Sequence, residues 1–252
     1  MSAVVAAPYR PRTDLAARLR RRSARVMATD TVRPRLSRGL VSLSFDDCPV
    51  SVRDNALPLL EARGWRGTVY ACLGLVGHCN HLGEHMSGRD YRTAFEAGHE
   101  IGDHTYSHLD GLAQGPGRVL RDAERNTDAL AALGIPAPKT FAYPYGEVTP
   151  ALKRALRGRY RLLRGIHSPR GGTVDLALAA SQRLYSAHMD AVERALEHCA
   201  AQRTWLILFT HDVRDAPSEF GCTPDEFAAV LERIARLGLD VATVAQGAER
   251  AA

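Results

Sequence analysis

Short apolar runs alternate with amphipathic stretches from residue 40 to the end of the chain. A run of about four to eight apolar residues is typical of a buried strand, and apolar residues at every third or fourth position are typical of a helix that covers a sheet. The pattern predicts strands over 40–45, 68–73, 99–103, 140–143, 160–163, 205–210 and 239–243, with a weaker candidate at 183–185. It predicts helices between them, over 55–63, 89–97, 118–133, 150–157, 190–202 and 224–237.

This alternation is typical of parallel strands joined by covering helices, so we expect an α/β barrel with seven or eight parallel strands. The helix over 224–237 has the clearest start, because Thr223 can cap it, Pro224 suits its first turn and Glu226 completes a capping box. The chain of 252 residues has the usual length of one barrel domain. We therefore assign residues 39–252 to a single catalytic domain.

Positive charge is concentrated in the first 38 residues. This segment holds ten Arg and two acidic residues, about +8 of formal charge, whereas the whole chain carries +5. We assign residues 1–38 to a basic N-terminal arm, disordered or partly helical, that could contact an anionic surface such as acidic lipid or a partner. Nucleic acid is not expected as a partner, because neither stacking aromatics nor zinc-finger spacing accompanies the arginines.

Neither a secretory signal nor a membrane span is predicted. The apolar stretch at 3–7 is too short for a signal and is followed by Pro8, and no run of about 18 apolar residues occurs. The five cysteines are odd in number and show no Cys-x-x-Cys spacing, so we expect them to be reduced. Together these features predict a cytoplasmic protein.

Acidic and histidine residues follow two of the predicted strands. Asp46 and Asp47 end the apolar run 41–45, and His104 and His108 follow the strand at 99–103. A carboxylate at the end of a buried strand needs a partner such as a metal ion. One carboxylate and two imidazoles suit zinc, and also iron, cobalt or nickel, so we predict Asp47, His104 and His108 as metal ligands. Asp46 would then act as a base.

Two further polar clusters reach the same edge of the predicted barrel. The carboxyl ends of barrel strands form the active sites of such folds. The turn at 141–146 follows one strand, and we predict that Tyr145 presents its backbone N–H to a developing oxyanion. His211 follows the strand at 205–210, and its convergence with the other clusters makes it the best candidate for a general acid.

A third group of metal-ligating side chains lies in the loop at 77–88. It contains His78, Cys79, His81 and His85. The Gly and Asn residues of this loop favour irregular backbone, and the spacing does not match a known ligand pattern. We therefore interpret it as a polar rim loop rather than a second metal site.

With these residues identified, the chain resembles the polysaccharide deacetylase family, carbohydrate esterase family four, which shares the NodB homology domain. The resemblance covers about residues 40–244 and rests first on two motifs. Residues 44–48 match Thr-Phe-Asp-Asp-Gly, and residues 104–108 match His-Ser/Thr-x-x-His. It implies a distorted, NodB-like (β/α) barrel, Asp46 as base, Asp47 with the two histidines as ligands, and one divalent ion, zinc first and cobalt or nickel as alternatives.

The remaining motifs match less completely. Residues 208–211 fit the fifth motif, Leu-x-x-His, but Cys48 replaces a family Gly and the fourth motif has no convincing match. The third motif, Arg-x-Pro-Tyr/Phe-Gly, becomes Ala142-Tyr143-Pro144-Tyr145-Gly146 here, so the Arg that usually braces the catalytic Asp is absent. A branch of the family carries this variant. Our hypothesis is that Arg164, after the fifth strand, takes the role of that Arg.

The resemblance implies hydrolysis of an N-acetyl group on an amino sugar, in an oligosaccharide, a polysaccharide or a sugar conjugate. One alternative is a different C–N hydrolase on the same scaffold, such as a deformylase of a lipid-linked sugar or a cyclic amide hydrolase. A carbohydrate-binding protein without activity is the other alternative. It would not need a base, three ligands and an acid together.

Overall fold

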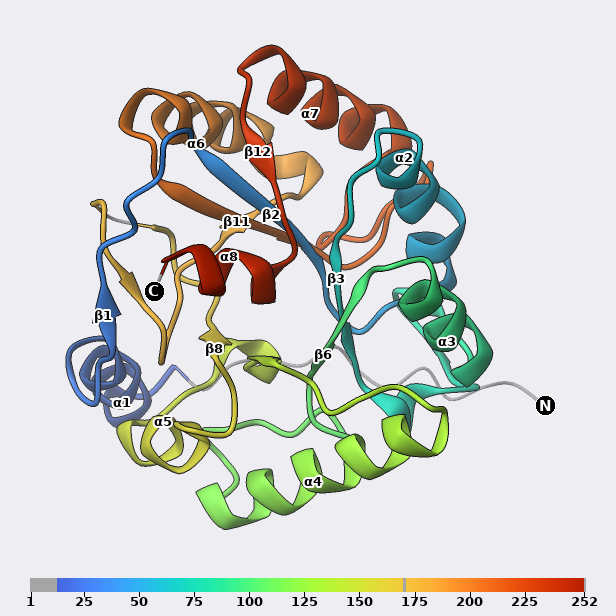
Figure 1. The fold of residues 1–252 in the computed structure, drawn as a ribbon. Helices are drawn as coiled ribbons and strands as arrows, with labels where there is room; N and C mark the ends of the chain where they lie inside the picture. The colour runs from blue at the N-terminus through green and yellow to red at the C-terminus, as the bar shows by residue number, and fades with distance from the viewer. Residues whose placement is uncertain (1–12, 170, 252) are drawn as a thin grey trace.

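The computed structural model describes residues 13–169 and 171–251, and its centre is a curved sheet of eight parallel strands (Figure 1). The strands lie in the order β10-β11-β2-β3-β6-β7-β8, and β12 pairs with β2. Their bounds are β2 Leu40–Phe45, β3 Thr68–Ala71, β6 Glu100–Asp103, β7 Thr140–Ala142, β8 Leu162–Arg164, β10 Gln182–Arg183, β11 Trp205–Thr210 and β12 Asp240–Val241. The fold is the distorted (β/α) barrel that the sequence predicts.

Helices surround the sheet on its outside (Figure 1). They are α2 Leu57–Glu61, α3 Gly88–Glu96, α4 Pro116–Ala132, α5 Pro150–Leu156, α6 Met189–Gln202 and α7 Pro224–Arg236. Short single turns lie at Val52–Ala56, Leu73–Leu75, Pro144–Gly146 and Ser186–His188. The capping box predicted for α7 is present, because the Thr223 side chain accepts from the Glu226 N–H and the Glu226 side chain accepts in return.

Three predicted elements lie in different positions. The weaker strand candidate at 183–185 is observed one residue earlier, as β10. The expected strand at 160–163 begins at Leu162 instead, because Tyr160 belongs to the preceding turn and donates its hydroxyl to Asp103 over 2.6 Å. The expected helix at 55–63 begins earlier, with a wide turn over Val52–Ala56 that continues into α2. The strands at 40–45 and 205–210 are confirmed to the residue.

The N-terminal segment from residue 13 packs against the barrel. Helix α1, Leu15–Val26, begins at the Asp14 cap and buries Ala17 and Ala24. Strand β1, Thr31–Val32, pairs antiparallel with β9, Val174–Asp175. Residues 1–12 of the predicted arm lie outside the described residues. None of the helices in the described part of the chain is both long and apolar enough to cross a bilayer.

The amino ends of the strands form the closed end of the barrel. Helix α8, Val244–Ala251, lies across this end (Figure 1). Thr68 and Thr140 donate their hydroxyls to the Glu100 carboxylate, and the Ala245 N–H donates to it over 2.8 Å. The first residues of three strands and the start of α8 are thereby held by one acidic side chain. The carboxyl ends remain open for the candidate site.

Candidate active site

Strained backbone marks the carboxyl end of the barrel. Seven of the described non-glycine residues have positive φ, and five of them lie in the loops that follow β2, β6 and β7. Those five are Asp47, Cys48, Thr105, His108 and Tyr145. Left-handed backbone is costly for such residues and concentrates at functional sites. The same loops carry the residues that the motifs predict.

Asp47, His104 and His108 form one cluster, whose ligand atoms all lie within 4.8 Å of one another. Asp47 Oδ1 lies 3.0 Å from His108 Nε2 and 3.5 Å from His104 Nε2, and the two imidazole nitrogens are 3.2 Å apart. In a tetrahedral zinc site, bonds of about 2.0–2.1 Å place the ligand atoms about 3.3 Å apart. The three side chains therefore fit a divalent ion without rearrangement.

The electrostatics of this cluster favour a carboxylate and a neutral imidazole. Burial alone would raise the pKa of Asp47, but His108, His104 and His211 together hold that pKa well below its usual range. Burial lowers the pKa of His104 to about 4. A deprotonated carboxylate and a neutral imidazole are the forms that bind a metal ion.

Hydrogen bonds to the backbone orient two histidines at this cluster. His104 Nδ1 lies 2.8 Å from the Ala142 carbonyl, so its N–H donates there and Nε2 faces the cluster. His85 Nδ1 lies 2.8 Å from the Asp47 carbonyl, and its ring is only 2 % exposed. His78, Cys79 and His81 are exposed, as expected of a polar rim loop, whereas His85 of the same loop is buried beside Asp47. The sequence had flagged this histidine in its loop, but had not linked it to Asp47.

Asp46 is buried beside the cluster and forms an ion pair with Arg164. Arg164 Nη2 donates to Asp46 Oδ2 over 2.5 Å, and the arginine is fully buried. Its guanidinium also lies 4.8 Å from the Phe209 ring and 5.2 Å from the Tyr70 ring. Within the described residues, the other carboxylate oxygen, Asp46 Oδ1, has no hydrogen-bond partner. One carboxylate oxygen of Asp46 is therefore fixed, and the other is available to accept a hydrogen bond or a proton.

The register of the sheet explains how Arg164 reaches this position. Ala142 on β7 pairs directly with Arg164 on β8. Position 142 is where the motif of the resembled family has its Arg, so the guanidinium in this chain comes from the neighbouring strand at the same level. Cys48, which follows the acidic pair, is fully buried, and burial raises the pKa of its thiol well above the usual value.

Tyr145 and His211 border the cluster from two sides. The Tyr145 ring packs edge-on against His108, with centroids 4.2 Å apart, and burial raises the pKa of Tyr145 to about 12. His211 lies close enough to Asp47 to contribute to the lowered pKa of that carboxylate. Tyr185 and Phe220 lie beside the His211 ring, with centroids 5.9 and 5.6 Å away. Sequence reasoning did not place either aromatic residue at the site.

The loop that carries His211 is held by Asp212. This buried carboxylate accepts from the Ser218 backbone N–H and hydroxyl and pairs with Arg214 at 2.8 Å. The Phe220 carbonyl in turn accepts from the His211 backbone N–H over 3.1 Å. His211 is therefore positioned by a locally rigid loop.

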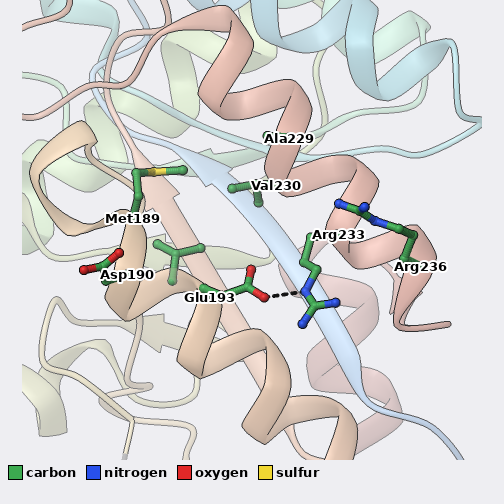
Figure 2. A pocket seen from close by; sticks show the side chains of 8 residues that line it. Met189, Asp190, Glu193, Ala229, Val230, Arg233 and Arg236 are labelled. Atoms are coloured by element: carbon green, nitrogen blue, oxygen red, sulfur yellow. Dashed lines mark hydrogen bonds and ion pairs between the residues drawn. The ribbon is translucent and has the colours of Figure 1, made fainter.

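A groove elsewhere on the molecule has different chemistry. It lies between α6 and α7, where Met189 and Val230 line it and the Glu193 carboxylate turns to Arg233 at 2.5 Å (Figure 2). None of the residues predicted for the site lines this groove. The convergent groups at the carboxyl end of the barrel are the better candidate for catalysis.

Comparison with known proteins agrees with the motifs. The family model for polysaccharide deacetylase matches residues 33–159, half of the chain. A probable peptidoglycan-N-acetylglucosamine deacetylase from Arthroderma benhamiae is 26 % identical over 120 residues, which are 47 % of this chain and 26 % of that protein. The chain thus matches about a quarter of the length of this relative.

Solved structures show the same fold. A chitin deacetylase from Colletotrichum lindemuthianum is 18 % identical, with a TM-score of 0.61 over 87 % of this chain and 91 % of that one. A family 4 acetyl xylan esterase from Clostridium thermocellum, in complex with a cobalt ion, is 19 % identical, with a TM-score of 0.56 over 82 % and 89 % of the two chains. A family 4 carbohydrate esterase from Streptomyces lividans, in complex with acetate, is 19 % identical, with a TM-score of 0.55 over 84 % and 96 %.

Proposed function

The chain belongs to the polysaccharide deacetylase family, and from this premise we propose that it removes an N-acetyl group from an amino sugar in a metal-dependent hydrolysis. The observation that carries the proposal is the pairing of a ligand cluster with an adjacent carboxylate that has one fixed and one unpartnered oxygen. A carbohydrate-binding protein without activity would gain nothing from this arrangement.

Asp47, His104 and His108 would hold the divalent ion, zinc in the first place and cobalt or nickel as alternatives. When bound, such an ion polarises a carbonyl oxygen and lowers the pKa of a coordinated water from about 15.7 to about 7. The Ala142 carbonyl fixes the His104 ring, and His85 fixes the Asp47 backbone. Both ligands are thus oriented by hydrogen bonds on the side away from the ion.

Asp46 serves as the general base in this proposal. Its Oδ1 removes a proton from water as the water oxygen attacks the acetamide carbon, while Arg164 holds Oδ2 in place. Arg164 is thus a positioning residue that stands in for the missing motif Arg. The Tyr145 N–H donates to the oxygen that gains negative charge in this step.

His211 serves as the general acid. As the carbon–nitrogen bond breaks, its imidazolium gives a proton to the departing nitrogen, so that the products are acetate and the free amine. The charge interaction between His211 and Asp47 supports a position close to the reacting groups. The hydrogen bond and ion pair of Asp212 hold the loop that carries His211, and so keep its imidazole at this place.

The test is acetate release from a panel of N-acetylated oligosaccharides and sugar conjugates. The full chain is stripped with a chelator and reloaded with zinc, cobalt or nickel. We expect no acetate from the stripped protein and restored release after reloading. Formate or another product in place of acetate would instead support the alternative of a different C–N hydrolase. Metal binding without any product would contradict the enzymatic proposal.

The location of the protein is part of the proposal. We expect it in the cytoplasm, where sugar conjugates rather than cell-wall polymers would be its substrates. Fractionation of cells that express the full-length gene with a C-terminal tag tests this point. Recovery of the protein outside the cell would contradict it.

A further inference from the structure

Helix α1 is fixed on the barrel by one face. Ala17 and Ala24 are buried, and Arg21 on the same side pairs with Glu147 at 2.6 Å. Lys153 of α5 donates to the Ala24 carbonyl over 2.9 Å and pairs with Asp175 at 2.8 Å. The rotation of the helix about its axis is therefore set, and so is the face that it turns outward.

The outward face is apolar along its centre. Leu15, Leu19 and Val26 are 73 %, 57 % and 74 % exposed. At about 100° per residue, all three lie within roughly 30° of the line opposite Ala17 and Ala24. Together with Met27 at the end of the helix, they are the large apolar side chains that are exposed in the described part of the chain. We call Leu15, Leu19 and Val26 the apolar stripe.

Arginines flank the apolar stripe. Arg18, Arg22 and Arg25 are exposed and lie on one side of it, and Arg20 lies on the other. The helix contains no acidic residue. A short helix with a central apolar stripe and a basic border is typical of segments that lie in the interface of an anionic bilayer.

We propose that the outer face of α1 is a docking surface for an anionic lipid bilayer. The apolar stripe would enter the boundary between headgroups and acyl chains, and the four arginines would contact lipid phosphates. A second copy of the chain fits this face poorly, because it would bring two sets of arginines together. A nucleic acid would not cover the apolar stripe.

The position of α1 gives this surface a consequence for the site. Glu147, to which Arg21 is paired, follows Tyr145 and Gly146 on the loop that borders the ligand cluster. Docking through α1 would therefore hold the carboxyl end of the barrel near the membrane. The docking itself does not depend on which reaction the site performs.

The experiment is co-sedimentation of the full chain with vesicles. One set contains phosphatidylcholine alone, and the other contains about one-third phosphatidylglycerol. We expect binding to the anionic vesicles only, and weaker binding at high salt because the phosphate contacts are screened. Absence of binding to the anionic vesicles, or equal binding to both sets, would overturn the proposal.

Two triple variants separate the parts of the surface. Leu15→Ser, Leu19→Ser and Val26→Ser together should weaken binding at least about tenfold, since the stripe can no longer enter the interface. Arg18→Gln, Arg22→Gln and Arg25→Gln together should weaken it on the order of a hundredfold, at about fivefold for each arginine. All six side chains are exposed, so thermal unfolding should not change.

The matched control removes the same charge elsewhere. Arg118, Arg194 and Arg236 are exposed on α4, α6 and α7, and their replacement by Gln should leave vesicle binding within about twofold of the parent chain. An equal loss in this control would show a non-specific charge effect and overturn the assignment to α1. Light scattering gives a second check. Self-association that the serine variant abolishes, without vesicle binding, would assign the stripe to a second copy instead.

Discussion

At the closed end of the barrel, the Glu100 carboxylate accepts hydrogen bonds from Thr68, Thr140 and the Ala245 N–H. At the open end, the Asp46 carboxylate is bound on one oxygen by Arg164, and its other oxygen has no partner within the described residues. Both acids sit where neighbouring strands converge. The first is saturated by groups that tie strands and α8 together, whereas the second is fixed in place and kept available.

The difference between the ends shows how one barrel separates stability from chemistry. A buried polar group without a partner costs free energy, so an orphaned oxygen persists only where the surrounding structure holds it. The positive-φ residues cluster at the same open end, which adds backbone strain to the unsatisfied oxygen. At the closed end both oxygens of the Glu100 carboxylate accept hydrogen bonds, so this acid adds no such cost.

The largest effect should come from removing Asp46, the proposed base at the open end. Asp46→Asn keeps the shape of the side chain but cannot take a proton, so kcat should fall by about 10²- to 10⁴-fold while metal content is unchanged. Glu100→Gln is the matched control, because it makes the same change at the closed end and should leave kcat within about twofold. Near-normal turnover by Asp46→Asn, or equal losses in both variants, would refute the comparison.

Breaking the ion pair between Arg164 and Asp46 should have the next largest effect. Arg164→Gln leaves the Asp46 carboxylate buried without a counter-ion, so the free energy of unfolding should fall by about 3–5 kcal/mol. Turnover should fall at least about tenfold with metal content intact, because the base is no longer held. Urea denaturation and steady-state kinetics measure the two effects.

A double variant distinguishes a specific pair from general damage. Asp46→Asn combined with Arg164→Gln removes both charges, so it should recover part of the stability that Arg164→Gln alone loses. Arg164→Lys keeps the charge but loses the planar fork, and should restore stability better than turnover. Unchanged turnover in Arg164→Gln would mean that another group braces the base.

A smaller effect is expected at the closed end. Glu100→Ala leaves two threonine hydroxyls and the Ala245 N–H without their acceptor, so it should lower the free energy of unfolding by about 2 kcal/mol. Turnover below the unfolding transition should be unaffected, in contrast to Asp46→Asn. A loss of kcat without a loss of stability would place Glu100 in the catalytic machinery and contradict the separation of the two ends.

The sequence predicted the open end better than the closed end for a physical reason. Strands β2 and β11 are rich in large apolar residues and are followed directly by acidic or histidine residues, so their bounds and the chemistry that follows them are visible in the pattern. Helix α8 mixes small and polar residues and was not predicted. Its place depends on Glu100, whose bonds to Thr68 and Ala245 span long sequence separations.

Contacts made by backbone atoms could not be predicted from the sequence either. The Ala142 carbonyl orients His104, and the Asp47 carbonyl binds His85, but a carbonyl has no residue type to mark it. The hypothesis for Arg164 followed from the missing motif Arg at position 142. Ala142 and Arg164 are direct partners in the register of β7 and β8, which explains why a side chain from β8 can reach the same place. Helix α1 was obscured because its arginines suggested a solvated arm, while its buried face consists only of small residues.

His85 offers a finer test of the open end. His85→Leu removes the donor to the Asp47 carbonyl and should weaken zinc affinity about tenfold, the low end for partners of metal ligands. His85→Asn can still donate and should recover part of that affinity. His78→Leu, an exposed position in the same loop, is the control and should have no effect. Titration against a chelator of known affinity measures all three, and an unchanged His85→Leu would contradict the positioning role.

The smallest expected effect concerns His99, which precedes β6 at the closed end. Its Nδ1 accepts from the Gly67 N–H over 3.0 Å, its Nε2 lies 3.1 Å from Glu61, and burial lowers its pKa below 6.5. Below pH 6.5 the unfolded chain takes up a proton that the folded chain resists, so His99 should reduce the free energy of unfolding as the pH falls. The loss is at most about 1.4 kcal/mol per pH unit.

The test compares two variants with the parent chain between pH 7 and pH 5.5. His99→Gln cannot titrate at this position, so it should lose less stability than the parent. His198→Gln, at an exposed position, should follow the parent. Parallel curves for all three proteins would contradict the role of His99 in this pH dependence.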